Sequence, residues 1–212
     1  MRLNRLWPIS ALLKKASLLA LMPILSMSMA LGLIIPPSFA NDNSNLFTQF
    51  QPVSVIAGQF KQRKFFRVLK HPIVSSGELY FDQQLGFLWQ TQQPITSAIL
   101  FKNDTLYAQS GQGELTKINA GSALAKVMSK AISGDLAALN SEFTISQAMS
   151  AACLSLVPRN QQQLKVIASI ELCGNGQLES LSLFEASGNR TEITLSLNVI
   201  EQLPERVRAQ LQ

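Results

Sequence analysis

Large apolar side chains recur at every second position in three consecutive runs between residues 77 and 101. They are Leu79 and Phe81, Phe87 and Trp89, and Ile99 and Phe101. A period of two is typical of β-strands, because successive side chains point to opposite faces of the sheet. The runs therefore predict an antiparallel sheet with one face lined by aromatic and aliphatic groups. Such a face is suited to holding something apolar rather than to reacting with it.

The same pattern continues along the chain and predicts a long antiparallel sheet with two or three helices, an α+β fold. Short polar segments separate the runs, which favours hairpins over crossover connections. The predicted strands cover residues 57–69, 77–82, 86–91, 97–102, 105–109, 114–118, 151–157, 165–172, 178–184 and 191–199. In the first of them Phe60 is expected to point inward. Residues 161–167 are also compatible with a helical turn.

Helical spacing replaces the alternation in residues 121–133. The apolar residues on one side of this predicted helix are Leu124, Val127, Met128, Ala131 and Ile132. Ser122 is expected to cap its start and Gly134 to end it. Asp135 could then cap a further turn at residues 136–139.

Two more helices are expected at the ends of the sheet. Residues 45–56 carry Leu46, Phe47, Phe50 and Val53 in an amphipathic pattern, which Pro52 interrupts. Residues 201–212 are a candidate for a polar helix.

The first 40 residues have the features of a secretory signal peptide. Arg2, Arg5, Lys14 and Lys15 supply a basic start, and the uncharged stretch that follows ends in small residues at Ser38 and Ala40. An uncleaved membrane anchor is the alternative interpretation. Cleavage after Ala40 leaves residues 41–212 as one periplasmic domain.

Removal of the leader also changes the charge argument. The whole chain carries a net charge of +5, but four of its 18 basic residues lie in the leader, so 14 remain against 13 acidic ones. A mature net charge of +1 gives no reason to expect a nucleic-acid partner.

Cys153 and Cys173 are the two cysteines, and both lie in the mature part. An even pair in an oxidising compartment favours a disulfide. The alternative is that they are two small buried side chains that never meet. Without a C-x-x-C spacing, no redox or zinc site is expected.

The order and spacing of several short motifs resembles the outer-membrane lipoprotein carrier family, the LolA type. The resemblance spans residues 46–197. Its motifs are Phe60-x-Gln62, Ser76-Gly77-x-Leu79-x-Phe81, Gly86-Phe87-Leu88-Trp89-x-Thr91, Pro94, Ile99-Leu100-Phe101, Ser133-Gly134-Asp135-Leu136-x-x-Leu139 with Phe143, Leu154-x-Leu156-x-Pro158, and the run from Glu185 to Ile193. One departure is Ala151-Ala152-Cys153, where family members often have a Trp.

The resemblance implies an incomplete β-barrel that helices close, with an apolar cavity that shelters acyl chains on their way across the periplasm. The cargo would be a lipid or a lipoprotein, and an inner-membrane donor and an outer-membrane acceptor are possible partners. No cofactor, metal or catalytic residue is implied. The expected cavity residues are Phe60, Leu79, Phe81, Phe87, Trp89, Ile99, Phe101, Leu154 and Leu156. The helix at residues 121–133 and the N-terminal helix would act as lids, with Leu124, Val127, Met128 and Ile132 facing the cavity.

Other interpretations of the same residues stay open. The apolar stripe could be an ordinary core, and the protein a non-catalytic structural or interaction subunit of an envelope assembly. An enzyme is not expected, because His71 is the only histidine and no nucleophile or metal-ligand motif is present. The basic cluster Lys61, Arg63, Lys64, Arg67 and Lys70 could bind anionic headgroups or an acidic partner, or could protect an edge strand against pairing.

Overall fold

The computed structural model describes residue 46 and residues 48–111, 113–119 and 121–212. The predicted signal peptide, residues 1–40, lies outside the described residues. None of the helices in the described part has the length and apolarity that a transmembrane helix requires.

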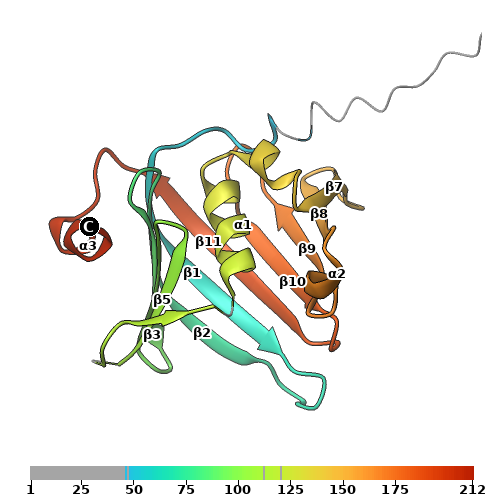
Figure 1. The fold of residues 1–212 in the computed structure, drawn as a ribbon, viewed down its shortest axis with the longest axis horizontal. Coiled ribbons are helices and arrows are strands. Elements are labelled where there is room, and N and C mark those ends of the chain that lie inside the picture. Colours follow the sequence, from blue (N-terminus) through green and yellow to red (C-terminus); the bar gives the residue numbers. More distant parts are fainter. Residues whose placement is uncertain (1–45, 47, 112, 120) are drawn as a thin grey trace, which may run out of the picture. The chain divides into compact units, whose positions relative to one another are not determined.

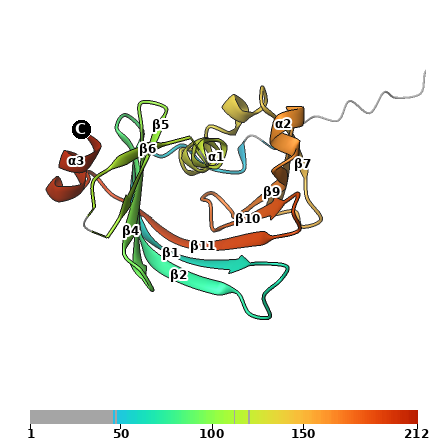
Figure 2. The same cartoon turned by 60° about the horizontal axis from the view of Figure 1, so that its bottom comes forward.

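Within these residues, eleven strands form one antiparallel sheet in the order β6-β5-β4-β3-β2-β1-β11-β10-β9-β8-β7. Their bounds are β1 (Val55–Phe65), β2 (Ile73–Asp82), β3 (Gly86–Gln93), β4 (Ser97–Lys102), β5 (Thr105–Ser110), β6 (Thr116–Ile118), β7 (Phe143–Gln147), β8 (Cys153–Pro158), β9 (Ile167–Cys173), β10 (Ser180–Glu185) and β11 (Arg190–Val199). The sheet curls, but its edge strands β6 and β7 do not pair, so the barrel is open (Figure 2). This confirms the predicted α+β fold with an incomplete barrel.

Helix α1 (Ser122–Ile132) lies inside the curve of the sheet (Figure 2). Its apolar side packs against the concave face, which we define as the face that carries Phe60, Leu79, Phe87, Leu156 and Ile193. The buried residues of this helix are Ala125, Val127, Met128, Ala131 and Ile132. The large cluster that results is the main core of the domain. A 3-10 helix, η2 (Leu136–Leu139), follows α1 and adds Leu136 and Leu139 to it.

The ends of α1 differ in part from the prediction. Gly121, with φ of 86°, is the N-cap, and Ser122 is the first helical residue and donates its hydroxyl to the carbonyl of Asn119. The prediction that Ser122 caps the helix was therefore wrong. Gly134 follows the C-cap with φ of 76°, as expected of a glycine after a helix end. Asp135 precedes η2 but makes no capping hydrogen bond, because its carboxylate instead binds Lys130 at 2.9 Å.

Helix α3 (Glu205–Leu211) packs on the opposite, outer face of the sheet. Its buried residues Val207 and Leu211, together with Leu203, cover an apolar patch of strands β2 to β4. The sheet residues of this patch are Tyr80, Leu88, Ala98 and Leu100. The predicted polar helix at the C-terminus is therefore amphipathic, and both faces of this part of the sheet are buried.

The predicted N-terminal helix is the main error in the fold. Of its described residues, only Leu46 and Thr48 are helical, in a 3-10 turn; residues 51–53 have no regular structure, and strand β1 already begins at Val55. Phe50 instead forms a parallel bridge with Gly176, and the amide of Gln51 donates to the carbonyl of Gly176 at 2.7 Å. Pro52 cannot donate a helical hydrogen bond, which favours this extended path. Phe47, predicted on the same helix, lies outside the described residues.

Smaller differences concern both halves of the chain. Strand β7 had no counterpart in the predicted strands, and β8, β9 and β10 each begin two residues later than predicted. In the first half, β1 ends at Phe65 rather than at residue 69, and β2 begins at Ile73 rather than at residue 77. Residues 161–167 are partly helical and partly strand. Helix α2 (Gln161–Leu164) is a single turn that Asn160 caps, and Ile167 begins β9.

Candidate ligand-binding cavity

Strands β2, β3 and β4 set the predicted apolar residues in register on the concave face. Leu79 pairs with Trp89, which pairs with Ile99. In the next row Phe81 pairs with Phe87 and Phe87 with Phe101. The alternation in the sequence thus becomes two continuous rows of side chains across three strands.

Phe60 of β1 extends this surface to the middle of the sheet. Its ring stacks on Trp89, with ring centroids 3.7 Å apart and an angle of 27° between the planes. The direct partner of Phe60 on β2 is Gly77, whose missing side chain leaves the ring room to reach β3. A Cβ at Gly77 would lie 1.9 Å from the carbonyl oxygen of Gln90, so no larger residue fits this position.

A cavity of about 150 Å³ lies between this face and the first half of α1. Its lining comes from strands β1, β3, β4, β5, β6 and β11 and from the start of α1. The lining residues are Gln62, Phe87, Trp89, Ile99, Leu106, Ile118, Gly121, Leu124, Ala125, Met128 and Ile193. Gln62 is the only one with a polar side chain. The space opens to solvent, and its volume is enough for a molecule about as large as benzene. A complete acyl chain needs more room, which a movement of α1 would supply.

The predicted site residues divide between this cavity and the packed core. Phe87, Trp89 and Ile99 line the cavity, and so do Leu124 and Met128 of α1. The others are held within the large core cluster: Phe60, Leu79, Phe81, Phe101, Leu154 and Leu156 of the sheet, and Val127 and Ile132 of α1.

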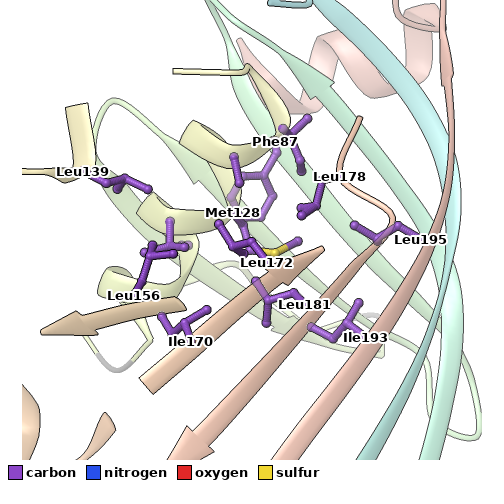
Figure 3. Close-up of a cluster of buried hydrophobic side chains, with 14 of the residues drawn as sticks. Phe87, Met128, Leu139, Leu156, Ile170, Leu172, Leu178, Leu181, Ile193 and Leu195 are labelled. Carbon is purple, nitrogen blue, oxygen red and sulfur yellow. The ribbon is translucent and has the colours of Figure 1, made fainter. Parts of the chain in front are cut away.

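Leu154 and Leu156 lie on β8, in the other half of the sheet from the cavity. They pair with Leu172 and Ile170 of β9, and all four are fully buried. Figure 3 shows Leu156, Ile170, Leu172 and Leu181 pointing toward the same interior as Met128. This half of the interior is filled by protein side chains.

Several lining residues were not in the predicted set. The inward position of Ile193 could have been predicted from the alternation of Thr191, Ile193 and Leu195 on β11. That of Leu106 could have been predicted in the same way from β5. Alternation along one strand does not predict which residues lie beside it on the neighbouring strands. Ile193 lies beside Gln62 because β1 pairs with β11.

The polar contacts of α1 do not tie it to the strands under the cavity. Lys126 forms an ion pair with Glu142, just before β7, and Lys130 pairs with Asp135. At the C-terminal end of the helix, the amide of Val53 donates to the carbonyl of Ser133 at 3.4 Å. Over the cavity, α1 is therefore held mainly by apolar contacts, which a ligand could replace.

The end of the barrel near the helix C-terminus is closed by other contacts. A disulfide joins Cys153 and Cys173, directly opposite each other on β8 and β9 with Cα atoms 4.1 Å apart. The side-chain amide of Gln49 donates to the carbonyls of Ala152 and Gly174, at 2.6 and 3.1 Å. Glu171 lies beside the two sulfur atoms, but sulfurs bonded to each other are not available as thiolate metal ligands.

Two groups have shifted pKa values, and neither lines the cavity. Burial, with help from the nearby Glu78 carboxylate, raises the pKa of Tyr80 on the outer face. For Glu185, burial alone would raise the pKa, but hydrogen bonds from Asn189 and Ser187 and the Lys64 ammonium at 3.4 Å lower it overall.

The basic cluster does not protect an edge strand. Strand β1 is internal and pairs with both β2 and β11, so that interpretation was wrong. Two of its residues have an acidic neighbour. Lys64 pairs with Glu185, and Arg63 lies 3.7 Å from Glu192, which Arg190 approaches more closely at 3.0 Å. His71 is exposed in the loop that follows β1.

Residues 51–205 match the profile of the protein family described as outer membrane lipoprotein carrier protein LolA. Among curated proteins, no sequence gives a significant match. The chain is similar in fold to a LolA superfamily protein from Nitrosomonas europaea, at 9% identity and a TM-score of 0.43, over 77% of this chain and 94% of that one.

Two further solved structures have comparable similarity. A DUF1329 family protein from Desulfovibrio piger is 9% identical, with a TM-score of 0.47, over 81% of this chain and 97% of that one. A chain of the MucA/MucB complex from Pseudomonas aeruginosa is 17% identical, with a TM-score of 0.33, over 74% of this chain and 55% of that one. At these values the three structures indicate nothing about what this chain binds.

Proposed function

The chain belongs to the outer membrane lipoprotein carrier protein LolA family, and from this premise we propose that it is a periplasmic carrier of acyl chains. It would shelter the chains of a lipid or lipoprotein during transfer toward the outer membrane. The observation that carries the proposal is the cavity under α1, where ten of eleven lining residues present apolar groups or no side chain.

Transfer of an acyl chain through water needs such a shelter. Exposure costs about 0.8 kcal/mol per CH₂ group, so a 16-carbon chain faces a cost on the order of 10 kcal/mol. The carrier must offer a comparable apolar surface and still release its cargo. Here the buried side of α1 covers the concave face, and entering cargo would displace it. Because one apolar surface replaces another, the total burial changes little and loading stays reversible.

The proposed life cycle begins with export. Residues 1–40 act as a signal peptide and are removed after Ala40, which leaves residues 41–212 in the periplasm. An inner-membrane donor and an outer-membrane acceptor would deliver and receive the cargo. The protein would not be an enzyme, because a cavity whose only polar side chain is the Gln62 amide offers no acid, base or nucleophile.

The direct test is to purify the protein from its native envelope and to analyse bound material by mass spectrometry. We expect acyl-containing molecules in stoichiometric amount. A second measurement uses Trp89, the only tryptophan of residues 41–212, whose fluorescence an acyl chain carrying a spin label should quench on entry.

A matched pair of variants ties uptake to the cavity. Leu124→Gln places a polar group in the lining, and we expect at least tenfold weaker quenching of Trp89. Leu115→Gln makes the same change at an exposed site outside the lining and should leave uptake unaltered. If the protein carries no lipid and takes up no probe, the alternative of a non-catalytic structural subunit replaces the carrier.

A further inference from the structure

The loop that joins β1 and β2 combines exposed apolar side chains with basic ones. We call residues 66–72 the hairpin tip. Val68 is 86% exposed and Leu69 51%, and the adjoining Ile73 and Val74 are 50% and 44% exposed. Figure 1 shows this hairpin extending beyond the neighbouring hairpin of β10 and β11 at the lower edge of the domain. Single exposed apolar residues are common, but four within seven positions on a projecting loop are not.

The charge of the tip is positive and uncompensated. Residues 61–74 contain five basic residues and no acidic one. On the strand, Lys64 pairs with Glu185, and Arg63 shares Glu192 with the closer Arg190. Among the described residues, no carboxylate lies within ion-pair distance of Arg67 or Lys70. The outermost part of the hairpin therefore carries free cations beside bare apolar groups.

Other exposed apolar residues lie at the same end of the sheet. Ser76 at the start of β2 pairs with Gln93 at the end of β3, and Ser97 of β4 pairs with Ser110 of β5. The turns after β3 and β5 are therefore at the end where the tip lies. These turns carry Ile95 and Leu115, which are exposed, and exposed Val166 precedes β9 at this end. Val157, at the end of β8 beside the start of β9, lies at this end as well, so eight of the ten exposed large apolar residues in the described part are found here.

Part of the cavity lining also lies toward this end. Gln62 of the lining pairs with Ser75 near the tip, whereas Phe87 lies toward the other end of the strands, beside the β2–β3 turn. That other end also carries the disulfide and the contacts of Gln49 and Phe50.

We propose that this end of the barrel docks on an anionic lipid bilayer, with Val68 and Leu69 in the interface and Arg67 and Lys70 on the lipid phosphates. A bilayer fits both features at once, because its surface attracts basic side chains and its interior accepts apolar ones. An acidic protein would use the charges but would leave the apolar residues unexplained. The inference concerns the surface of the protein and does not depend on cargo in the cavity.

The test is flotation with lipid vesicles, using protein purified from cells that express the full chain. We expect binding to vesicles of phosphatidylethanolamine and phosphatidylglycerol at low salt, weakening as salt rises, and little binding to phosphatidylcholine alone. Each basic residue near an anionic surface contributes about fivefold to binding, so Arg67→Gln with Lys70→Gln should weaken it roughly 25-fold. Val68→Ser with Leu69→Ser should weaken it about tenfold.

Matched controls separate the tip from a general effect. Lys102→Gln with Arg208→Gln removes two charges away from the tip, and Met149→Ser with Val199→Ser removes two exposed apolar residues at the opposite end. A Val68→Cys variant carries an environment-sensitive label, which should shift to the blue on vesicles, while the same label on Met149→Cys should not. The native cysteines are paired and do not react.

Three results would overturn the proposal. They are no vesicle binding by the wild type at low salt, equal losses in the control variants, or binding that needs Arg67 and Lys70 but not Val68 and Leu69. The last result would make the tip a site for an acidic protein. Because the vesicles contain no spin-labelled cargo, each of these outcomes leaves the uptake measured at Trp89 untouched, and the proposed carrier function stands or fails separately.

Discussion

Two helices cover the same strands from opposite sides, and they cover them differently. Helix α3 lies on the outer face, where Leu203, Val207 and Leu211 are each at most 5% exposed over Tyr80, Leu88 and Leu100. Its Arg206 also donates to the hydroxyl of Tyr80 at 3.2 Å and lies 3.6 Å from Glu78. Helix α1 lies over the alternate residues of the same strands and leaves about 150 Å³ unfilled. Helix α3 is thus packed as part of the fold, and in the proposed function a ligand displaces α1.

The largest expected effect comes from the outer face of the sheet, which α3 covers. Leu88→Ala removes a side chain that is 1% exposed beneath α3. We expect a loss of about 2–5 kcal/mol in the free energy of unfolding, because the outer face cannot collapse into the space. Uptake of the acyl probe should be unchanged. Urea denaturation measures the first quantity and Trp89 quenching the second, and a loss below about 1 kcal/mol would remove the contrast between the helices.

A matched pair of alanine substitutions tests the contrast directly. Ala125→Leu on α1 fills the cavity, and we expect a gain of about 0.5–2 kcal/mol in stability together with at least tenfold weaker probe uptake. Ala98→Leu adds the same atoms to the packed outer face and should cost about 1–3 kcal/mol with uptake intact. Thermal unfolding shows whether each variant is more or less stable than the wild type. A change in the same direction in both variants would contradict the difference in packing between the two faces.

A smaller effect is expected where α1 is tethered. Lys126→Met removes the ion pair with Glu142, both of whose side chains are about one-third exposed. The stability should fall by less than about 1 kcal/mol, because solvent screens such pairs. The rate of probe uptake should nevertheless rise severalfold, since the helix is freer to move. Stopped-flow quenching measures the rate; the matched control Arg206→Met, on α3, should leave it constant.

The smallest effect is confined to high pH. Burial first, and then the Glu78 carboxylate, raises the pKa of Tyr80 above the ordinary tyrosine value of 10.0. The folded state then holds this proton more tightly than the unfolded state does, so its contribution is complete below pH 10 and is lost as the pH rises through the folded pKa. We expect the stability of the wild type to fall above pH 10 more steeply than that of Tyr80→Phe. Parallel curves would show that the contact with α3 is not coupled to this proton.

The sequence was sufficient for the hairpins of the first half of the sheet, but not for strand β7 of the second half or for the way in which the two halves pair. The alternation of Leu79, Phe87 and Trp89 identified one face of the meander, because period two needs no tertiary information. Leu88 and Leu100 are apolar as well, and such near-continuous apolar runs are typical of strands buried on both sides. The helix that buries them lies at the far end of the chain.

The division between cavity and core could not be predicted from the strands. Leu156 and Trp89 occupy equivalent inward positions, yet Leu156 is packed and Trp89 lines a space. The difference depends on where α1 lies across the curved sheet, which only the assembled fold defines. The pairing of Cys153 with Cys173 depends likewise on the register of β8 and β9.

The pairing of β1 with β11 at the centre of the sheet has a kinetic consequence. Phe60 meets Leu195, so the seam between the two halves joins residues from the two ends of the domain. Such long-range pairing makes folding slow, in the range of milliseconds to seconds rather than microseconds, and this is measurable as a slow refolding phase. It also means that the central seam cannot close until nearly the whole chain has been synthesised. Such a delay suits the proposed export, in which the chain crosses a membrane unfolded before β1 pairs with β11.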